Sequence, residues 1–349
     1  MAKNESVARV RLENILKDGR LLVVLVVGIP LLLIGLWIAF DLTVGISLLV
    51  FGMAVLILSA KNAVDHSIKI ASALRFPPLM IGLIVVSMGT DFPEIVNSFV
   101  SSSLGHGDIN VGDSFGSVLA QMTLILGLLA LVGRQIKVDR NEVVTLGAAE
   151  ILALIASLSM VEKGYITWMN AAFLVVSWPI LLLLTRSIAK GSSITSSRPN
   201  RRISYHLAAA ILAFVGVAVG SYIVIQSVIA MCAVLRVPEY FISFFVVAVG
   251  TSLPELAVDL TAIRKKQYEI AIGDAIGSSI IDAGFSIGIG ALFFSPLRLT
   301  SRLAEITGLY ALLASFVVLV VLAWGRKLDT KAGLLFIILY AASYLTLFI

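Results

Sequence analysis

The sequence predicts an all-α polytopic membrane protein with about eleven transmembrane helices, and three observations support this. Of the 349 residues, 59% are hydrophobic and only 13% are charged. Apolar runs of roughly 20 residues, the length that a helix needs to cross a bilayer, recur along the whole chain. Two of these runs contain the same short motif, Gly-Thr-x-x-Pro-Glu, which places a proline and a carboxylate where lipid alone would not tolerate them.

The predicted spans are one N-terminal helix followed by two repeats of five helices, which we expect to be inverted. Residues 1–20 are polar and form either an amphipathic surface helix or a disordered tail. The spans are expected at 21–40, 43–60, 78–104, 108–132, 144–161, 165–188, 205–230, 239–263, 270–296, 303–324 and 332–349. The chain then divides into a tail with an extra helix (1–42), a first repeat (43–188), a polar cytoplasmic linker (189–204) and a second repeat (205–349).

The basic residues predict how the chain is oriented. With the N-terminus in the cytoplasm, 22 of the 26 Lys and Arg residues fall on the cytoplasmic side. The positive-inside rule therefore places the N-terminus in the cytoplasm and the C-terminus on the opposite side, and we expect the cell membrane. The net charge of +5 reflects this orientation and not nucleic-acid binding. The single cysteine, Cys232, excludes an internal disulfide, and we expect it to be buried.

The two motifs belong to a longer internal repeat. Residues 89–127 align without a gap on residues 250–288, at an offset of 161, and ten of the 39 aligned positions are identical. The shared residues are mainly Gly, Pro, Glu, Asp, Ser and Thr, whereas a chance match between apolar helices would share Leu, Ile and Val. The loops after the two copies are expected on opposite sides of the membrane. Inverted repeats with interrupted helices that meet at the midplane are typical of secondary transporters.

The chemistry of the motifs indicates cation binding at mid-membrane. Pro93 and Pro254 each remove a backbone donor, and the glycine four residues earlier makes the bend cheap. A freed carbonyl is tolerated within the bilayer only where it lines a cavity or meets a ligand. Carbonyls, hydroxyls and carboxylates are hard oxygen donors that favour Ca²⁺ or Na⁺. The candidate ligands from the motifs are Thr90, Asp91, Glu94, Thr251, Ser252 and Glu255, and those from the next span of each repeat are Ser117, Gln121, Ser278 and Asp282.

Other polar residues in the spans carry less specific predictions. No Lys or Arg lies between Arg75 and Arg134, so the acids of the first repeat have no fixed cation. Glu150 has no acidic counterpart in the second repeat and is a protonated or hydrogen-bonded acid or a participant in transport. Asp259, one turn after Glu255, is an ion or proton relay or sits near the cytoplasmic end. The three histidines fall in or beside loops, where we expect them to be solvated.

At this level of detail the sequence resembles the cation/Ca²⁺ exchanger superfamily, which includes Na⁺/Ca²⁺ and H⁺/Ca²⁺ exchangers. Gly250-Thr251-Ser252-Leu253-Pro254-Glu255 and Gly277-Ser278-Ser279-Ile280-Ile281-Asp282 are similar to the two halves of its repeat signature. The resemblance implies alternating access, with Glu94 and Glu255 as central Ca²⁺ ligands. It also implies that Thr90 and Thr251 contribute carbonyls. The adjoining sites would be lined by Ser117, Gln121, Ser252, Ser278 and Asp282.

Three departures from that signature concern the counter-ion. Asp91 stands where the family usually has a small hydroxyl residue, Gln121 where a shorter amide or acid is usual, and Asp113 and Asp274 where an asparagine is common. We therefore expect a secondary antiporter that exchanges Ca²⁺ for Na⁺, with H⁺/Ca²⁺ exchange as the alternative and no cofactor. A cation channel is disfavoured because channels commonly use symmetric subunits. An intramembrane aspartyl protease is a remote alternative, since nothing in protease chemistry requires paired Pro-Glu kinks.

Overall fold

The fold is described from a computed structural model for residues 42–73, 87–186, 203–264, 266, 268–300 and 302–348. The predicted span at 21–40, the first part of the span at 78–104 and nearly all of the linker lie outside these residues. The described chain is helical apart from four short strands, which confirms the all-α class. The described parts of the ten predicted spans from residue 43 onward overlap helical segments.

The first repeat contains a long first helix, an interrupted second span and three further spans. Its elements are α3 (Leu42–Ala73), α5 (Ser87–Thr90), α6 (Phe92–Ser103), α7 (Gly107–Leu119), the π-helix η2 (Ala120–Ile125), α8 (Leu126–Gly133), β1 (Gln135–Lys137), α9 (Arg140–Val161), β2 (Tyr165–Ile166) and α10 (Trp168–Arg186).

The second repeat has a similar order of elements, with α12, η3 and η5 in addition to those described for the first. Its elements are α11 (Ile203–Leu235), α12 (Glu239–Ile242), the π-helix η3 (Ser243–Val247), α13 (Ala248–Thr251), α14 (Leu253–Arg264), α15 (Tyr268–Ile280), the π-helix η4 (Ile281–Ser286), α16 (Ile287–Phe293), β3 (Leu297–Arg298), α17 (Leu303–Gly325), β4 (Lys327–Asp329), α18 (Thr330–Ala342) and the 3₁₀ helix η5 (Ser343–Phe348).

Element boundaries follow the sequence offset of 161 residues. Shifted by that number, α5, α6, α7 and η2 coincide with α13, α14, α15 and η4 at both ends. The strands connect the two repeats: β1 pairs antiparallel with β4, and β2 pairs antiparallel with β3. Each pair therefore joins an element of one repeat to an element of the other. The repeat therefore extends beyond residue identity to local geometry.

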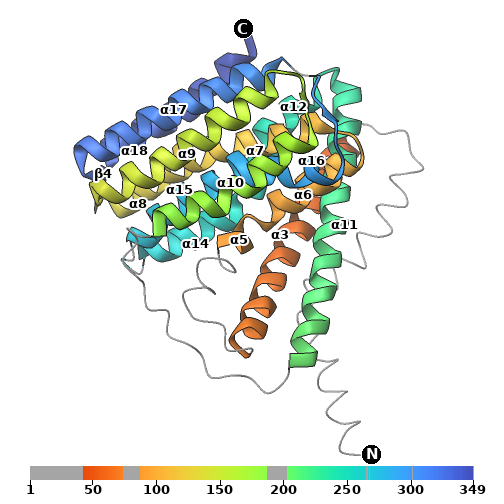
Figure 1. Cartoon of the computed structure of the whole chain (residues 1–349), viewed down its shortest axis with the longest axis horizontal. Helices are drawn as coiled ribbons and strands as arrows, with labels where there is room; N and C mark the ends of the chain where they lie inside the picture. The colour runs from red at the N-terminus through yellow and green to blue at the C-terminus, as the bar shows by residue number, and fades with distance from the viewer. Residues whose placement is uncertain are drawn as a thin grey trace, which may run out of the picture.

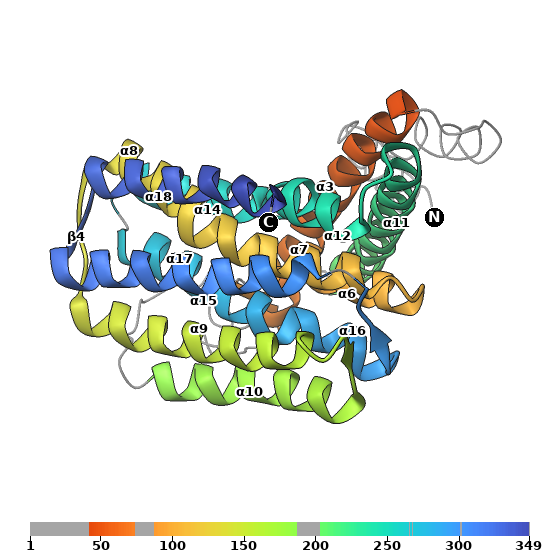
Figure 2. The same ribbon diagram turned by 90° about the horizontal axis from the view of Figure 1, so that it is seen from above.

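The first helices of the two repeats, α3 and α11, pack against each other and project from the remaining helices (Figures 1 and 2). Gly45 lies against Met231, and Gly220 lies against Leu56. Residue numbers thus rise along one helix as they fall along the other, so these repeat-related helices are antiparallel. This is the relation expected between repeats of opposite orientation.

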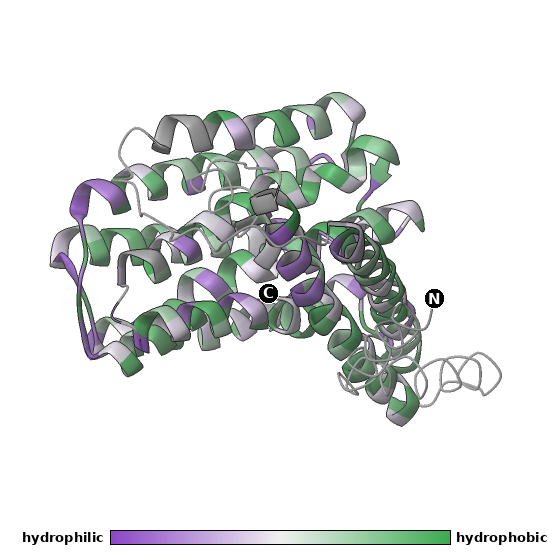
Figure 3. Cartoon of the chain, turned by 90° about the horizontal axis from the view of Figure 1, so that it is seen from below, coloured by the Kyte–Doolittle hydropathy of each residue, from purple (hydrophilic) through white to green (hydrophobic). Residues whose placement is uncertain are grey.

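The apolar surface matches a membrane protein. Seven described helices are long and apolar enough to cross a bilayer, and two shorter apolar helices, Trp168–Ile180 and Thr330–Leu345, accompany them. Large apolar side chains such as Trp324, Met169 and Phe293 are exposed. Figure 3 shows hydrophobic residues over most of the helices, with hydrophilic ones gathered at the β1–β4 end and at a few places within the bundle.

Candidate functional site

Both motif helices break at the same place. Helix α5 ends at Thr90 and α6 begins at Phe92, which leaves Asp91 between them with φ −78° and ψ 4°. In the second repeat Ser252 separates α13 from α14 with φ −81° and ψ 6°. Pro93 then occupies the first turn of α6, where a missing N–H removes no helical hydrogen bond. The two breaks are therefore equivalent in backbone geometry as well as in sequence.

Three carboxylates beside the breaks are buried without hydrogen-bond donors. Asp91 and Glu255 are 0% exposed and Glu94 is 1% exposed, and neither oxygen of any of them accepts a hydrogen bond from a described residue. They lie within electrostatic range of one another, and Ser278 is also close to Asp91. A buried carboxylate without a partner is strongly unfavourable, so these groups require a cation or a proton.

Fixed cations do not supply that charge. The ion pairs among the described residues are His106–Glu239 and Lys327–Asp329, and neither involves an acid of the motifs. The described Asp, Glu, His and Cys side chains also contain no group of three arranged to hold a metal ion by themselves. A cation bound here would therefore need carbonyl and hydroxyl oxygens in addition to the carboxylates, as both helix breaks and the neighbouring serines provide.

Gln121 and Asp282 occupy equivalent positions in the two repeats and bind each other. The amide Nε2 of Gln121 donates to Oδ2 of Asp282 at 2.9 Å. Ser286 Oγ donates to the other carboxylate oxygen of Asp282 at 3.0 Å, and Ser279 Oγ donates to Oε1 of Gln121 at 3.0 Å. Asp282 is thus fully paired in this conformation, in contrast to Glu94 and Glu255. The sequence argument did not identify the two serines that complete this network.

A second network surrounds Asp113. Asn97 Nδ2 donates to one oxygen of Asp113 at 2.6 Å, and Thr251 Oγ1 donates to the other at 3.0 Å. Ser221 Oγ donates to the Asn97 side chain at 3.3 Å. Asn97 was missed as a site residue, although it is a polar side chain one turn after Glu94 within an apolar span. Thr251 therefore has a side-chain role here, beyond the carbonyl role implied by the resemblance.

The remaining predicted residues are all buried near these groups. Ser117 Oγ donates weakly, at 3.4 Å, to the carbonyl of Ala248. The hydroxyls of Ser252 and Ser278 have no hydrogen-bond partner among the described residues, and Thr90 is 7% exposed. The structure consequently brings the ten predicted residues into one buried region that spans both repeats.

Comparison with known proteins decides the family. The family model for the sodium/calcium exchanger protein matches residues 44–186 and 205–349, one stretch in each repeat. The chain belongs to the sodium/calcium exchanger family. The sodium/calcium exchanger MaX1 of Methanosarcina acetivorans is 25% identical over 348 residues, covering 88% of this chain and 99% of that protein.

Two solved structures of exchangers have this fold. The sodium-calcium exchanger NCX_Mj is 26% identical, with a TM-score of 0.58 over 87% of this chain and 98% of that one. The H⁺/Ca²⁺ exchanger CAX is 15% identical and has a TM-score of 0.73, over 94% of this chain and 88% of that one. The likeness to CAX shows the fold alone.

Glycines let the helices of this family member approach closely around the site. A Cβ at Gly116 would lie 2.3 Å from the carbonyl oxygen of Phe244, and one at Gly112 would lie 3.0 Å from that of Tyr240. The equivalent glycine of the second repeat, Gly277, has no described atom within 4 Å of a built Cβ. Of this repeat-related pair, Gly116 is therefore closely packed and Gly277 is not.

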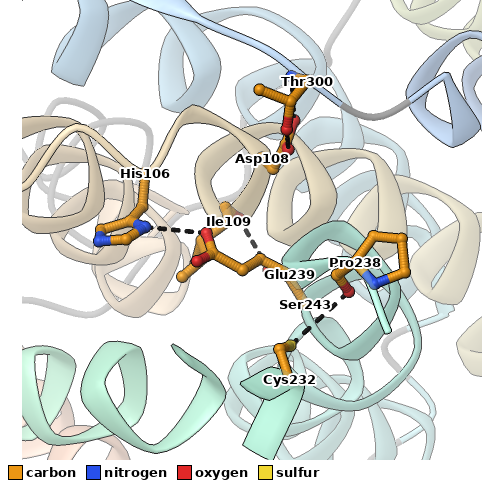
Figure 4. Close-up of polar contacts among 8 residues, drawn as sticks. All are labelled: His106, Asp108, Ile109, Cys232, Pro238, Glu239, Ser243 and Thr300. Atoms are coloured by element: carbon orange, nitrogen blue, oxygen red, sulfur yellow. Dashed lines mark hydrogen bonds and ion pairs between the residues drawn. The ribbon is translucent and has the colours of Figure 1, made fainter. Parts of the chain in front are cut away.

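Contacts at the start of α7 fix the helix that carries Asp113 and Ser117 (Figure 4). His106 Nδ1 and Glu239 Oε2 are 2.8 Å apart, which ties the α7 N-cap to the start of α12. The backbone N–H and hydroxyl of Thr300 both donate to Asp108. Ser243 Oγ donates to the carbonyl of Ile109 at 2.7 Å, and Cys232 is buried as expected, with its thiol 3.6 Å from the carbonyl of Pro238.

The expectation that the histidines are solvated is wrong for the α3–α11 pair. Helix α3 continues beyond its apolar run, and α11 begins before its own, so His66 and His206 lie on helices rather than in loops. Their Nδ1 atoms are 2.9 Å apart, and His206 is 5% exposed. One ring must donate and the other accept in this contact, which excludes protonation of both Nδ1 atoms at once.

Proposed function

We propose that this protein is a secondary active antiporter that exchanges Ca²⁺ for Na⁺ across the membrane by alternating access. Membership of the sodium/calcium exchanger family supports cation antiport and disfavours the aspartyl protease. The observation that carries the proposal is the matched pair Glu94 and Glu255. Each is buried beside a helix break, and each lacks both a hydrogen-bond donor and a basic partner among the described residues. Such a pair needs a mobile cation.

The residues would have distinct roles in holding that cation. Glu94 and Glu255 are the central carboxylate ligands, and Asp91 adds a third negative charge within range of both. The unpaired hydroxyls of Ser252 and Ser278 supply neutral oxygens. Thr90 and Thr251 contribute oxygens from the ends of the broken helices. Ser117, Gln121 and Asp282 line the adjoining positions.

Exchange of H⁺ for Ca²⁺ is the second candidate, and Asp91 is the observation that favours it. Its repeat mate is the neutral Ser252, whereas Asp91 is a buried carboxylate with two unpaired oxygens. A carboxylate in this setting can exchange a proton for a metal ion. We therefore expect Asp91→Ser to reduce any proton-driven Ca²⁺ uptake while retaining Na⁺-driven uptake.

Reconstituted vesicles test the proposal directly. Proteoliposomes loaded with Na⁺ should take up ⁴⁵Ca²⁺ when diluted into Na⁺-free medium, and a pH gradient alone should drive little uptake. At Ca²⁺ concentrations near the wild-type KM, Glu94→Gln and Glu255→Gln should each abolish uptake, whereas Glu162→Gln, which alters an exposed acid at the end of α9, should leave it unchanged. Uptake driven by the pH gradient but not by Na⁺ would replace Na⁺ by H⁺ as the counter-ion. Full uptake by both glutamate variants would refute their role.

The orientation predicted from the basic residues is also a proposal. In a Cys232→Ala background, a cysteine at Gly105 should react with an impermeant maleimide from outside intact cells. A cysteine at Lys266, the position in the second repeat that is equivalent to Gly105, should react only after the membrane is opened. Reaction of both positions from one side would contradict the inverted arrangement in the membrane.

A further inference from the structure

The two repeats satisfy their equivalent aspartates differently. In the first repeat, Asp113 accepts hydrogen bonds from Asn97 and Thr251, one on each oxygen. Its mate in the second repeat is Asp274, whose Oδ2 has no partner among the described residues. The residue equivalent to Asn97 is Val258, which carries no donor. Asp274 therefore lacks the amide donor that Asn97 provides to Asp113.

A second unpaired carboxylate lies beside Asp274. Asp259 on α14 is 0% exposed, and neither of its oxygens has a hydrogen-bond partner among the described residues. It interacts with the Asp274 side chain on α15, the helix that packs against α14. Its repeat mate is the neutral Ser98. Two acids thus face each other here, where the first repeat places a serine and a fully hydrogen-bonded aspartate.

This pair is separate from the central glutamates but continuous with them. Asp259 follows Glu255 by four residues, so the two lie on the same face of α14, about 6 Å apart along the helix. Asp91 lies within electrostatic range of both Asp259 and Asp274. Beyond Asp259, α14 ends at Arg264, which is exposed and forms no ion pair with either acid. The carboxylates therefore form a path from the centre towards the Arg264 end.

We propose that Asp259 and Asp274 bind a second divalent cation, one helical turn from Glu255 on the side of Arg264. Two facing carboxylates offer a charge that one divalent ion neutralises, and hard oxygens suit Ca²⁺. The site rests on the proposed function, because its role is to receive Ca²⁺ on the way between the central site and the Arg264 side, which is the expected cytoplasmic side. The first repeat has no equivalent pair of unpaired acids, so this second site lies on one side of the central glutamates only.

Equilibrium binding of ⁴⁵Ca²⁺ to the purified protein in nanodiscs tests the site without requiring transport. Asp274→Asn and Asp259→Asn should each bind one Ca²⁺ ion fewer per protein than wild type. The control is Glu162→Gln, which changes an exposed acid at the end of α9 and should keep the wild-type number. Asp259→Ser, which copies Ser98, gives a second variant at the same position should Asn not be tolerated. Gel filtration verifies that each variant is folded.

Transport in sided proteoliposomes separates this proposal from the one on which it rests. Asp259→Asn should raise the KM for Ca²⁺ on the Arg264 side about tenfold, the effect of losing one charged ligand contact, and leave the KM on the other side unchanged. An unchanged ion count in both Asp259 variants overturns the second site, as does an equal rise of KM on both sides. If wild type binds the extra ion but does not transport Ca²⁺, the proposed function fails and the site stands.

Discussion

Replacing Asp282 by Asn should affect Ca²⁺ transport much less than replacing Glu255 by Gln. Each substitution removes one negative charge from a buried side chain and preserves its shape. The two carboxylates differ in their partners: Asp282 accepts from Gln121 and Ser286, one donor on each oxygen, whereas both oxygens of Glu255 are unpaired. A cation can coordinate Glu255 with all of its lone pairs, whereas each oxygen of Asp282 already shares one lone pair with a donor and offers less charge to a cation.

The size of the difference follows from these contacts. A hydrogen bond or ligand contact to a charged group contributes about 1.5–3 kcal/mol, so Glu255→Gln should weaken Ca²⁺ binding roughly 10-fold to 150-fold. In Asp282→Asn the amide of Gln121 still has an oxygen to donate to, and the hydroxyl of Ser286 can rotate to accept. Only a longer-range attraction is lost, for which we expect a change of about threefold.

The assay is Na⁺-driven ⁴⁵Ca²⁺ uptake measured against Ca²⁺ concentration, with both variants at equal protein content in the vesicles. Gel filtration and thermal unfolding establish that both are folded. A rise in KM for Asp282→Asn as large as that for Glu255→Gln would refute the reasoning. It would show that the hydrogen-bonded carboxylate of Asp282 contributes as much to Ca²⁺ binding as the unpaired carboxylate of Glu255.

Three further predictions concern stability, each measured by thermal unfolding in detergent. Gly220→Ala should destabilise the protein by about 1–3 kcal/mol, because the new Cβ would lie 2.6 Å from the backbone nitrogen of Leu56. Gly216→Ala should cost less, because its new Cβ would meet only the side chain of Ser59, with the Oγ at 2.5 Å and the Cβ at 3.0 Å. Asp329→Ala should lower the free energy of unfolding by about 1 kcal/mol, because Asp329 caps α18 through the N–H of Ala332. That hydrogen bond and Lys327 lower the pKa of Asp329. The stabilisation by Asp329 is therefore present at neutral pH and is lost as the pH falls through the lowered pKa. Burial also lowers the pKa of His66 below the ordinary 6.5, so on acidification the unfolded chain is protonated at this residue at a higher pH than the folded protein. Stability should therefore fall as the pH drops below about 6.5, and the fall should be smaller in His66→Gln than in wild type.

Local chemistry made the interrupted helices predictable, because the cause lies within each motif. A proline four residues after a glycine determines where a helix can bend, wherever the helix is packed. The breaks accordingly occur at Asp91 and Ser252, between residues that the sequence had singled out. The offset of 161 residues was also visible, since it relates side chains whose presence in apolar spans is rare.

The partners of each carboxylate were not predictable in this way, because they depend on which helices meet. Gln121 and Asp282 are 161 residues apart and bind each other. Sequence comparison marked them as equivalent positions but gave no reason for them to touch. Asn97 was missed for a related cause: its partner Asp113 lies on another helix. The error on His206 has the same cause, because its neighbour His66 lies on another helix, 140 residues earlier in the sequence.

The helices around the two breaks have equivalent boundaries in both repeats, so we trace the functional differences between them to side chains. Asp91 against Ser252, Asn97 against Val258, and Ser98 against Asp259 are three such differences, and all three lie around the broken helices. Each difference changes the number of carboxylates or of hydrogen-bond donors near the break without changing the helix boundaries. In the first repeat an amide satisfies Asp113; in the second, Asp259 and Asp274 keep unpaired oxygens. A symmetric scaffold can thereby present a neutral network towards one side of the central glutamates and a cation-binding one towards the other.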